Sequence, residues 1–513
     1  MIIPTSYSYK YSHPVHLKTI AKIFGINAVD VEKAKILEIG SKIGMNLLPI
    51  AYAYPKAQFI GMEYSNNNIN LAKAAAKELG LKNIEFKRIE NSNLEKSQEQ
   101  FDYIILHGIL SQISNKEQQN LLKFITSALK DNGVLYAHYD TLPGCFDGKL
   151  LKDLLKYHTN KLETHEDKIL QSRTLFNFFE NSFQNSDNLY HNYLKNLQQA
   201  TNKLNDKEFF THYLEAQIKN PCYFFEFINK ISKVGLEYLT EAFMPSGHLD
   251  NLPEQIAKEL SNIKDKNQIQ QYIDFITNRK FRSSILCKQN IVKNVKIEYL
   301  PFENFYFNSS LVTDNKISDI DIKDKQDVVF YNFYDRSIEC KISSPRMKAI
   351  MYSLIENPYQ QFSLEELLDK AAYKLKTKKI DLIRKIFLDN IVHMVLSGYI
   401  NATSDKFSKN IIDIDNLQTP KALPLAKYQV EILQQNIVTN NTHDTIQLDD
   451  FEQLVIKLMD GINDKSKIIS NIMDKINNGE LNIQKEGKMD IEKIVYENLN
   501  YVINKLYILG LLI

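Results

Sequence analysis

The 513-residue sequence predicts an α/β protein, with a doubly wound, mainly parallel sheet in its first half and smaller α+β modules in its second. Three observations predict this class. Between residues 35 and 145, apolar runs of strand length alternate with segments of helical periodicity, as βαβ units require. After about residue 291, alternating hairpin strands are followed by helices. A chain of this length also exceeds one ordinary hydrophobic core, so two to four domains are expected.

The predicted elements of the first half follow one another without long loops. An N-terminal amphipathic helix, 16–24, stops at Gly25. The next elements are the strand KILEI (35–39), a helix (45–54), the strand QFIGM (58–62), a helix (68–79), the strands IEFKRI (84–89) and YIILH (103–107), a helix (116–130) and the strand VLYAHY (134–139). Ligands bind such sheets at the carboxyl ends of the strands, near the point where strand order reverses.

The turn after the first strand has the composition of a cofactor-binding loop. Residues 35–46 read KILEIGSKIGMN, where Gly40 and Gly44 let backbone N–H groups approach a ligand closely. The E-x-G-x-x-x-G spacing is neither the dinucleotide G-x-G-x-x-G nor a phosphate loop, so phosphate is not the expected ligand. Glu63 closes the second strand, where a carboxylate can accept hydrogen bonds from two ribose hydroxyls.

This turn resembles motif I of the class I S-adenosylmethionine-dependent methyltransferases. In that family an acidic residue and a glycine-rich turn hold the amino-acid end of the cofactor, and the acidic residue of motif II follows. A glycine turn that only links a strand to a helix would share the short motif. The resemblance implies S-adenosylmethionine as cofactor and S-adenosylhomocysteine as product. The predicted cofactor-binding residues of this region are Glu38, Gly40, Ser41, Gly44, Asn46, Glu63 and Tyr64.

Two further strand ends complete the predicted cofactor site. Glu90 follows the third strand, where class I enzymes often have an acidic or polar residue near the adenine amino group, and its neighbour Asn91 could serve instead. His107 ends the fourth strand, the position that faces the transferred methyl group in this fold. The surrounding stretch lacks the Asn/Asp-Pro-Pro-Tyr/Phe signature of enzymes that methylate nitrogens of nucleic acid bases and glutamine. Those substrates are therefore disfavoured.

Several separate blocks extend the resemblance over the first 290 residues. They are HGILS (107–111), YDTLPG (139–144), a long block at 209–247 and NRKFRSSILC (278–287). Together they resemble bacterial methyltransferases that carry a methyltransferase regulatory domain, and most closely the rickettsial protein-lysine methyltransferases that modify outer membrane protein B. The resemblance implies a protein substrate methylated on lysine, and a homodimer. Asp140 stands where many relatives have Asn, and Glu38 where class I enzymes often have Asp.

A lysine acceptor would need a specific kind of pocket. Its amine must be neutral to attack, and its reference pKa of about 10.4 keeps it mostly charged at neutral pH. A partly desolvated, aromatic-lined pocket lowers that pKa and holds the ammonium by cation–π contact. The candidates are Tyr7, Tyr9, Tyr11, His107 and Tyr139, of which Tyr9, His107 and Tyr139 are the predicted catalytic residues. Each tyrosine could instead pack in a core, and either His107 or solvent could accept the proton.

Three domains are predicted. Residues 1–290 form the methyltransferase core, with an insertion at about 146–220 that reads as continuous helix and would serve oligomer contacts or substrate access. FRSSILC (281–287) is its expected final, antiparallel strand. Residues 291–420 and 421–513 resemble winged-helix modules in outline, the last one mostly helical. Acidic residues are as common there as basic ones, which favours docking of a protein substrate over DNA binding.

Composition excludes several classes of partner. Lysine and arginine number 63 and aspartate and glutamate 62, interspersed along the chain, so no nucleic-acid footprint is expected. Four widely spaced cysteines indicate a reducing compartment. No signal-peptide pattern or membrane-length apolar segment occurs, which predicts a soluble, cytoplasmic protein without membrane contact. His191, His212 and Glu215 show no repeated metal-ligand spacing, so no metal site is predicted.

Two other functions are compatible with the same fold. A methyltransferase acting on a small molecule or an RNA would need a closed pocket or a basic groove, whereas this chain has more than 200 residues of near-neutral C-terminal modules. A non-catalytic scaffold that keeps only the cofactor fold would be expected to lose the acidic and glycine positions of the turn. Those positions are present.

Overall fold

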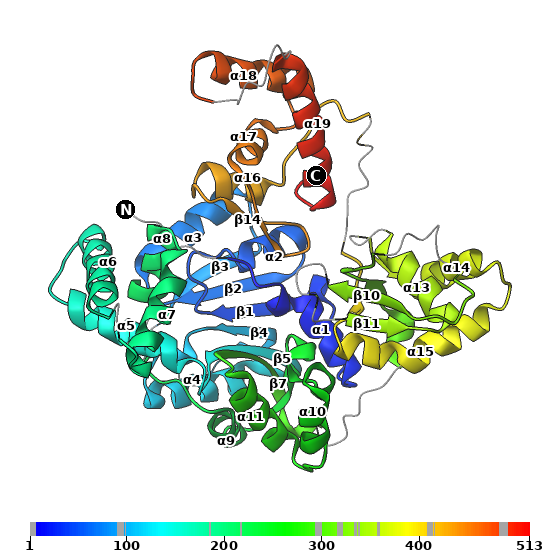
Figure 1. Ribbon diagram of the computed structural model, residues 1–513, viewed down its shortest axis with the longest axis horizontal. Coiled ribbons are helices and arrows are strands. Elements are labelled where there is room, and N and C mark those ends of the chain that lie inside the picture. The colour runs from blue at the N-terminus through cyan, green and yellow to red at the C-terminus, as the bar shows by residue number, and fades with distance from the viewer. Residues whose placement is uncertain are drawn as a thin grey trace.

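The computed structural model describes residues 7–89, 97, 99–183, 186–215, 218–292, 300–314, 322–332, 336, 339–356, 360–407, 414, 416–481 and 491–513. A central sheet is flanked by a helical insertion on one side and by a middle module on the other, while the C-terminal domain lies above it (Figure 1).

The central sheet of the described residues has seven strands in the order β3-β2-β1-β4-β5-β7-β6. They are β1 (Lys35–Ile39), β2 (Gln58–Glu63), β3 (Ile84–Arg88), β4 (Phe101–His107), β5 (Leu129–Asp140), β6 (Leu236–Glu241) and β7 (Phe281–Lys288). The neighbours from β3 to β5 pair in parallel, and β7 pairs antiparallel with both β5 and β6. The predicted doubly wound sheet with an antiparallel strand at 281–287 is confirmed.

Helices cover both faces of this sheet. They are α1 (Pro14–Ile23), α2 (Leu47–Ala53), α3 (Asn66–Glu78), α4 (Asn115–Ala128), α9 (Phe224–Ser232), α10 (Glu254–Ser261), α11 (Lys266–Thr277) and the short α12 (Gln289–Val292). Alternate β1 residues face opposite cores: Ile36 packs with α1 and α2, and Leu37 packs with α4 and α9. This two-sided burial explains why β1 is almost continuously apolar. Capping residues in the sequence determine where the helices begin. For example, Ser114 and Glu117 form a capping box at the start of α4.

The insertion between β5 and β6 differs from the continuous helix expected at 146–220. It is a set of separate helices, α5 (Phe146–Thr159), α6 (His165–Ser182), α7 (Leu189–Asn202) and α8 (Asp206–Phe209), followed by a π-helical turn (Phe210–Glu215). The prediction of one helix is wrong because Thr164 and Asn188 each accept a backbone hydrogen bond as N-caps and so start new helices. The insertion has a small core of its own around Leu155.

The middle module contains two three-stranded sheets in the described residues, ordered β11-β10-β9 and β12-β8-β13. Its elements are β8 (Tyr306–Asn308), β9 (Leu311–Val312), β10 (Val328–Asn332), β11 (Glu339–Ile342), α13 (Pro345–Ile355), β12 (Phe362–Ser363), α14 (Leu364–Leu375), α15 (Ile380–Leu396) and β13 (Asn401–Thr403). Its apolar interior is continuous with the core under α1. The buried Lys18 of α1 also pairs with Asp405 at 2.8 Å. The middle module and the sheet domain are therefore fused through α1.

The C-terminal domain has its own apolar core and a second contact with the sheet domain. Its elements are α16 (Pro424–Glu431), β14 (Ile437–Thr439), β15 (Thr445–Gln447), α17 (Asp450–Leu458), α18 (Lys465–Asn477) and α19 (Ile491–Ile508). Leu425 and Tyr428 of α16 pack with Met45 and Leu48, at the start of α2. The β14–β15 hairpin consequently lies beside α2 (Figure 1).

Candidate active site

The candidate site lies at the carboxyl ends of β1, β2, β4 and β5. Its two carboxylates, Glu38 and Glu63, lie near the ends of the neighbouring strands β1 and β2. Glu38 pairs with Gly61, which stands two residues before Glu63 on β2. Parallel pairing brings these strand ends to one edge of the sheet, where the order reverses between β1 and β4.

Glu38 is a buried acid with an unfilled hydrogen-bonding position. Its side chain is 1% exposed, and its Oε1 accepts a hydrogen bond from Asn46 Nδ2 at 2.9 Å. Its Oε2 has no hydrogen-bond partner among the described residues. Burial raises the pKa of Glu38 to about 8, and the nearby Glu63 carboxylate adds to the rise. A cationic group at Oε2 would supply the missing partner.

The turn from β1 to α2 leaves space that a side chain would fill. Gly40 and Gly44 both have left-handed backbone conformations, with φ of +84° and +82°. A Cβ on Gly40 would lie 3.1 Å from the His107 carbonyl oxygen, and one on Gly44 would lie 2.8 Å from the Phe86 ring. These two positions therefore require glycine for conformation and for space. The buried hydroxyl of Ser41, in the same turn, has no described hydrogen-bond partner.

Glu63 is held in place by backbone groups. Its Oε2 accepts from the Lys42 N–H at 2.9 Å, and its Oε1 accepts from the N–H groups of Tyr64 at 2.9 Å and Ser65 at 3.0 Å. A carboxylate fixed in this way still has acceptor capacity for a pair of hydroxyls. The unpaired oxygen of Glu38, the glycine cradle and the fixed Glu63 carboxylate fit the ammonium and ribose ends of the cofactor that the sequence implies.

Aromatic rings gather beside this edge. Tyr9 of the N-terminal arm lies 3.8 Å from His107 between ring centroids, and His107 lies 5.1 Å from His138 of β5. Phe281 of β7 continues the row at 5.2 Å from His138. Tyr9 is 42% exposed, so this row opens toward solvent. The predicted pair of Tyr9 and His107 is thus brought together next to Gly40.

The two histidines of this row are held neutral. Burial lowers the pKa of His107 well below its usual value, and His138 adds to the effect. Burial likewise lowers the pKa of His138 to about 4, with Lys42 adding to the effect. Neutral rings present π faces and ring nitrogens without a positive charge, so they do not repel an incoming ammonium.

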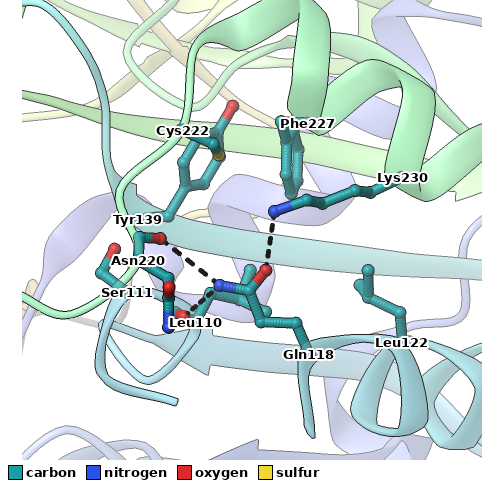
Figure 2. Close-up of a pocket in the computed structure, with 9 residues that line it drawn as sticks. All are labelled: Leu110, Ser111, Gln118, Leu122, Tyr139, Asn220, Cys222, Phe227 and Lys230. Atoms are coloured by element: carbon teal, nitrogen blue, oxygen red, sulfur yellow. Dashed lines mark hydrogen bonds between the residues drawn. The ribbon is translucent and has the colours of Figure 1, made fainter. Parts of the chain in front are cut away.

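Tyr139 does not join this row, which corrects its assignment to the acceptor pocket. It lies on the opposite face of β5 from His138, 1% exposed, and stacks on Phe227 at 4.0 Å. Figure 2 shows Tyr139 beside Cys222 and Phe227 at a small cavity whose polar groups are satisfied internally. For example, Lys230 Nζ donates to Gln118 Oε1 at 2.8 Å. Tyr139 is a core residue because successive side chains of a strand alternate between faces.

The other predicted residues have varied placements. Tyr11 contacts His16 and Phe243 rather than His107. Tyr64 is half-buried against the core under α4. Tyr7 is half-buried, and its place in the acceptor pocket stays a prediction. Glu90 and Asn91 lie outside the described residues.

Residues that sequence reasoning missed also meet here. One of them is His138. Side chains two residues apart on a strand share a face, so His138 could have been inferred once the face of β5 that Tyr136 occupies was known. His443 of the C-terminal domain donates from Nε2 to Asn46 Oδ1 at 2.9 Å. No local pattern around His443 signals that contact. In the π-helical turn of the insertion, burial lowers the pKa of His212 and raises that of Glu215, and Lys42 of the cofactor turn lowers both.

Neither a metal site nor a membrane-spanning helix occurs among the described residues. No group of three or more His, Cys, Asp or Glu side chains is arranged to hold a metal ion among them. No described helix is both long enough and apolar enough to cross a membrane.

Comparison with protein families gives three matches along the chain. A methyltransferase domain matches residues 30–196, a predicted methyltransferase regulatory domain matches 205–288, and the PKMT C-terminal winged helix domain matches 418–511. The last match confirms the predicted winged-helix character of the C-terminal domain. The second agrees with the resemblance carried by the blocks between 209 and 287.

Individual proteins match over nearly the whole chain. An uncharacterised protein of Rickettsia prowazekii (strain Madrid E) is 33% identical over 485 residues, which cover 94% of this chain and 87% of that protein. The structure of PKMT2 from Rickettsia typhi is 30% identical with a TM-score of 0.82, and its complex with AdoHcy is 29% identical with a TM-score of 0.83. Each of these alignments with PKMT2 covers 99% of both chains.

Proposed function

Because the chain belongs to the PKMT family of S-adenosylmethionine-dependent methyltransferases, we propose that it methylates lysine side chains of a protein. Its cofactor is S-adenosylmethionine, which supplies a methyl group on a sulfonium for in-line displacement by a nucleophile. The observation that carries the lysine proposal is the aromatic row of Tyr9, His107 and His138 beside the cofactor turn.

The chain's own residues would first bind and orient the two reactants. Glu38 Oε2 would accept from the ammonium of the cofactor, and Glu63 from its ribose hydroxyls, while Gly40 leaves space between β1 and β4. The acceptor lysine would extend past Tyr9, with its ammonium against the ring faces of Tyr9 and His107. Orientation of this kind can supply much of the rate enhancement in a bimolecular displacement.

The acceptor must then lose a proton before it attacks. Partial burial among neutral rings lowers the pKa of a lysine ammonium, because the charged form is desolvated. His107, which lies against Tyr9, or a water molecule would accept that proton, and water is favoured because burial lowers the pKa of His107 well below its usual value. The amine lone pair then forms the new N–C bond as the C–S bond breaks.

The proposed substrate is a surface protein of a bacterium, methylated on lysine side chains, with outer membrane protein B as the candidate from the family resemblance. Support comes from the near-neutral C-terminal modules, which offer docking surface without a nucleic-acid-binding charge. We also propose that the enzyme acts in the cytoplasm, before its substrate is exported, and that it forms a homodimer.

Mass spectrometry tests this proposal. A recombinant fragment of outer membrane protein B is incubated with the full chain and S-adenosylmethionine, with Glu63→Ala as the control. Methyl-sized increments on lysines, absent with the control, are expected. If no increment forms although calorimetry shows that the cofactor binds, the lysine proposal is wrong and the acceptor is to be sought among small molecules and RNA.

A further inference from the structure

Asn46, in the cofactor turn, contacts three separate parts of the chain: the N-terminal arm, β1 and the β14–β15 turn. It is 4% exposed, and its Nδ2 donates to Glu38 Oε1 at 2.9 Å and to Ser12 Oγ at 3.0 Å. Its Oδ1 accepts from the Tyr9 backbone N–H and from His443 Nε2, both at 2.9 Å. Both donor hydrogens and both acceptor lone pairs of the amide are therefore used. The orientation of Asn46, and through it that of Glu38, depends on all four contacts.

His443 makes this contact from a constrained position. It lies in the turn between β14 and β15, 2% exposed, with a left-handed φ of +66°. Burial lowers its pKa to about 3, so the ring is neutral and carries one proton. Because Asn46 Oδ1 can only accept, that proton must be on Nε2. Left-handed backbone is uncommon for residues other than glycine, although histidine adopts it more often than most, and a residue that keeps it in a packed turn can serve a function.

The same hairpin also holds the N-terminal arm. Thr439 Oγ1 donates to Ser8 Oγ at 3.1 Å, and Asp444 pairs with Lys10 at 3.1 Å. Tyr9 lies between these two contacts, with its N–H on Asn46 and its ring against His107. One loop of the C-terminal domain thus fixes both Glu38 on the cofactor side and Tyr9 on the acceptor side.

We propose that His443 is a positioning residue of the cofactor site, and that docking of the β14–β15 turn on Asn46 aligns Glu38 with the ammonium group of S-adenosylmethionine. This inference goes beyond the proposed function, since it holds whichever acceptor is methylated. Coupling between two sites is reciprocal, so cofactor binding must also strengthen the docking of the hairpin.

The principal test is the variant His443→Asn. Asparagine tolerates left-handed backbone, but its side chain is too short to reach Asn46, so the contact is lost while the turn is kept. Isothermal titration of the full chain with S-adenosylhomocysteine at pH 7 should give about tenfold weaker binding. Gln434→Asn is the matched control, because it shortens an exposed side chain at another left-handed position, φ +50°, of the same domain. It should bind as the natural sequence does.

A pH series separates positioning from a general loss of packing. The hydrogen bond from Asn46 lowers the pKa of Glu38, while Glu63 raises it and Lys42 lowers it. His443 and its neighbour His13 stay neutral throughout, since burial holds the pKa of both far below the range tested. If His443→Asn frees Asn46, the pKa of Glu38 rises further, and the loss of affinity is greatest at pH 6.5 and smaller at pH 8.5. Equal losses at every pH, or binding within twofold of the natural sequence at pH 7, would overturn the proposal.

Two further measurements do not depend on that variant. His443→Gln retains an amide donor that can reach toward Asn46 and should bind within about threefold of the natural sequence, whereas a loss as large as that of His443→Asn contradicts the proposal. In the natural sequence, S-adenosylhomocysteine should slow hydrogen–deuterium exchange of residues 437–447. Unchanged exchange there, with the ligand bound, would overturn the coupling.

Discussion

The cofactor side and the acceptor side of the site are held together by different kinds of contact. On the cofactor side, Glu63 receives three backbone hydrogen bonds from residues within one βαβ unit. On the acceptor side, Tyr9, His107 and His138 come from three separate segments and meet through their rings. The difference teaches that Glu63 is fixed by local backbone contacts, whereas the acceptor pocket exists only when the N-terminal arm is docked. Variants should therefore separate the two sides.

The largest effect is expected at Gly40 on the cofactor side. Gly40→Val should abolish binding of S-adenosylhomocysteine, because the side chain would enter the cradle next to the His107 carbonyl and strain a left-handed residue. Gly80→Val is a matched control: Gly80 also has a positive φ, +68°, but nothing lies within 4 Å of its would-be Cβ. Calorimetry should show binding for the control alone. A folded Gly40→Val protein that binds would disprove the assigned turn.

The next effect concerns Glu63. Glu63→Ala should weaken cofactor binding by about 1.5–3 kcal/mol, as expected when hydrogen bonds to a charged group are lost. Glu85→Ala, on the adjacent strand β3 with an exposed carboxylate, should leave the affinity unchanged. Calorimetric titration measures both. Equal affinities for the two variants would remove Glu63 from the cofactor site.

The third prediction is a pH dependence caused by Glu38. Its pKa is raised to about 8 by burial, so the carboxyl is mostly protonated below that pH in the cofactor-free protein. An ammonium binds the ionised form, so binding releases a proton and affinity should rise about tenfold from pH 6.5 to 8. Glu38→Gln should bind more weakly and lose this dependence. A flat profile for the natural sequence would show that Glu38 is already ionised or makes no contact with the ammonium.

The smallest effect is expected from Tyr9 and concerns only the acceptor side. Tyr9→Leu removes a cation–π partner worth about 0.5–1 kcal/mol at an exposed site, so kcat/KM for a protein acceptor should fall about two- to fivefold. Cofactor affinity should stay within twofold, because the contact with Asn46 uses the backbone N–H. Tyr157→Leu, on an exposed face of the insertion, is the control for losing a surface aromatic ring. A fall in cofactor affinity as large as that in kcat/KM would contradict the separation of the two sides.

The cofactor side could be predicted from sequence because its determinants are close together. Glu38, Gly40 and Glu63 lie within one strand–helix–strand unit, where apolar runs mark the strands and glycine marks the turn. The parallel pairing of the first five strands follows from the alternation of strands and helices, whereas the antiparallel β7 was expected from the family resemblance. The local sequence pattern was sufficient to identify these three residues.

The acceptor side could be predicted only in part. Tyr9 and His107 were identified, but Tyr139 was chosen where His138 faces the pocket, since the position at which a strand ends does not tell which face a residue occupies. On the cofactor side, His443 could not be found at all, because its contact with Asn46 spans 397 residues and depends on how two domains pack. Sequence pattern carries no signal for such a contact.

The fixing of the N-terminal arm by the last domain has a consequence for synthesis of the protein. Ser8 and Lys10 are synthesised before their partners Thr439 and Asp444, which follow more than 400 residues later. At bacterial elongation rates of about 5–20 residues per second, the arm waits for tens of seconds. The nascent chain can therefore assemble its sheet early but cannot fix its N-terminal arm over the candidate site until Thr439 and Asp444 have been synthesised.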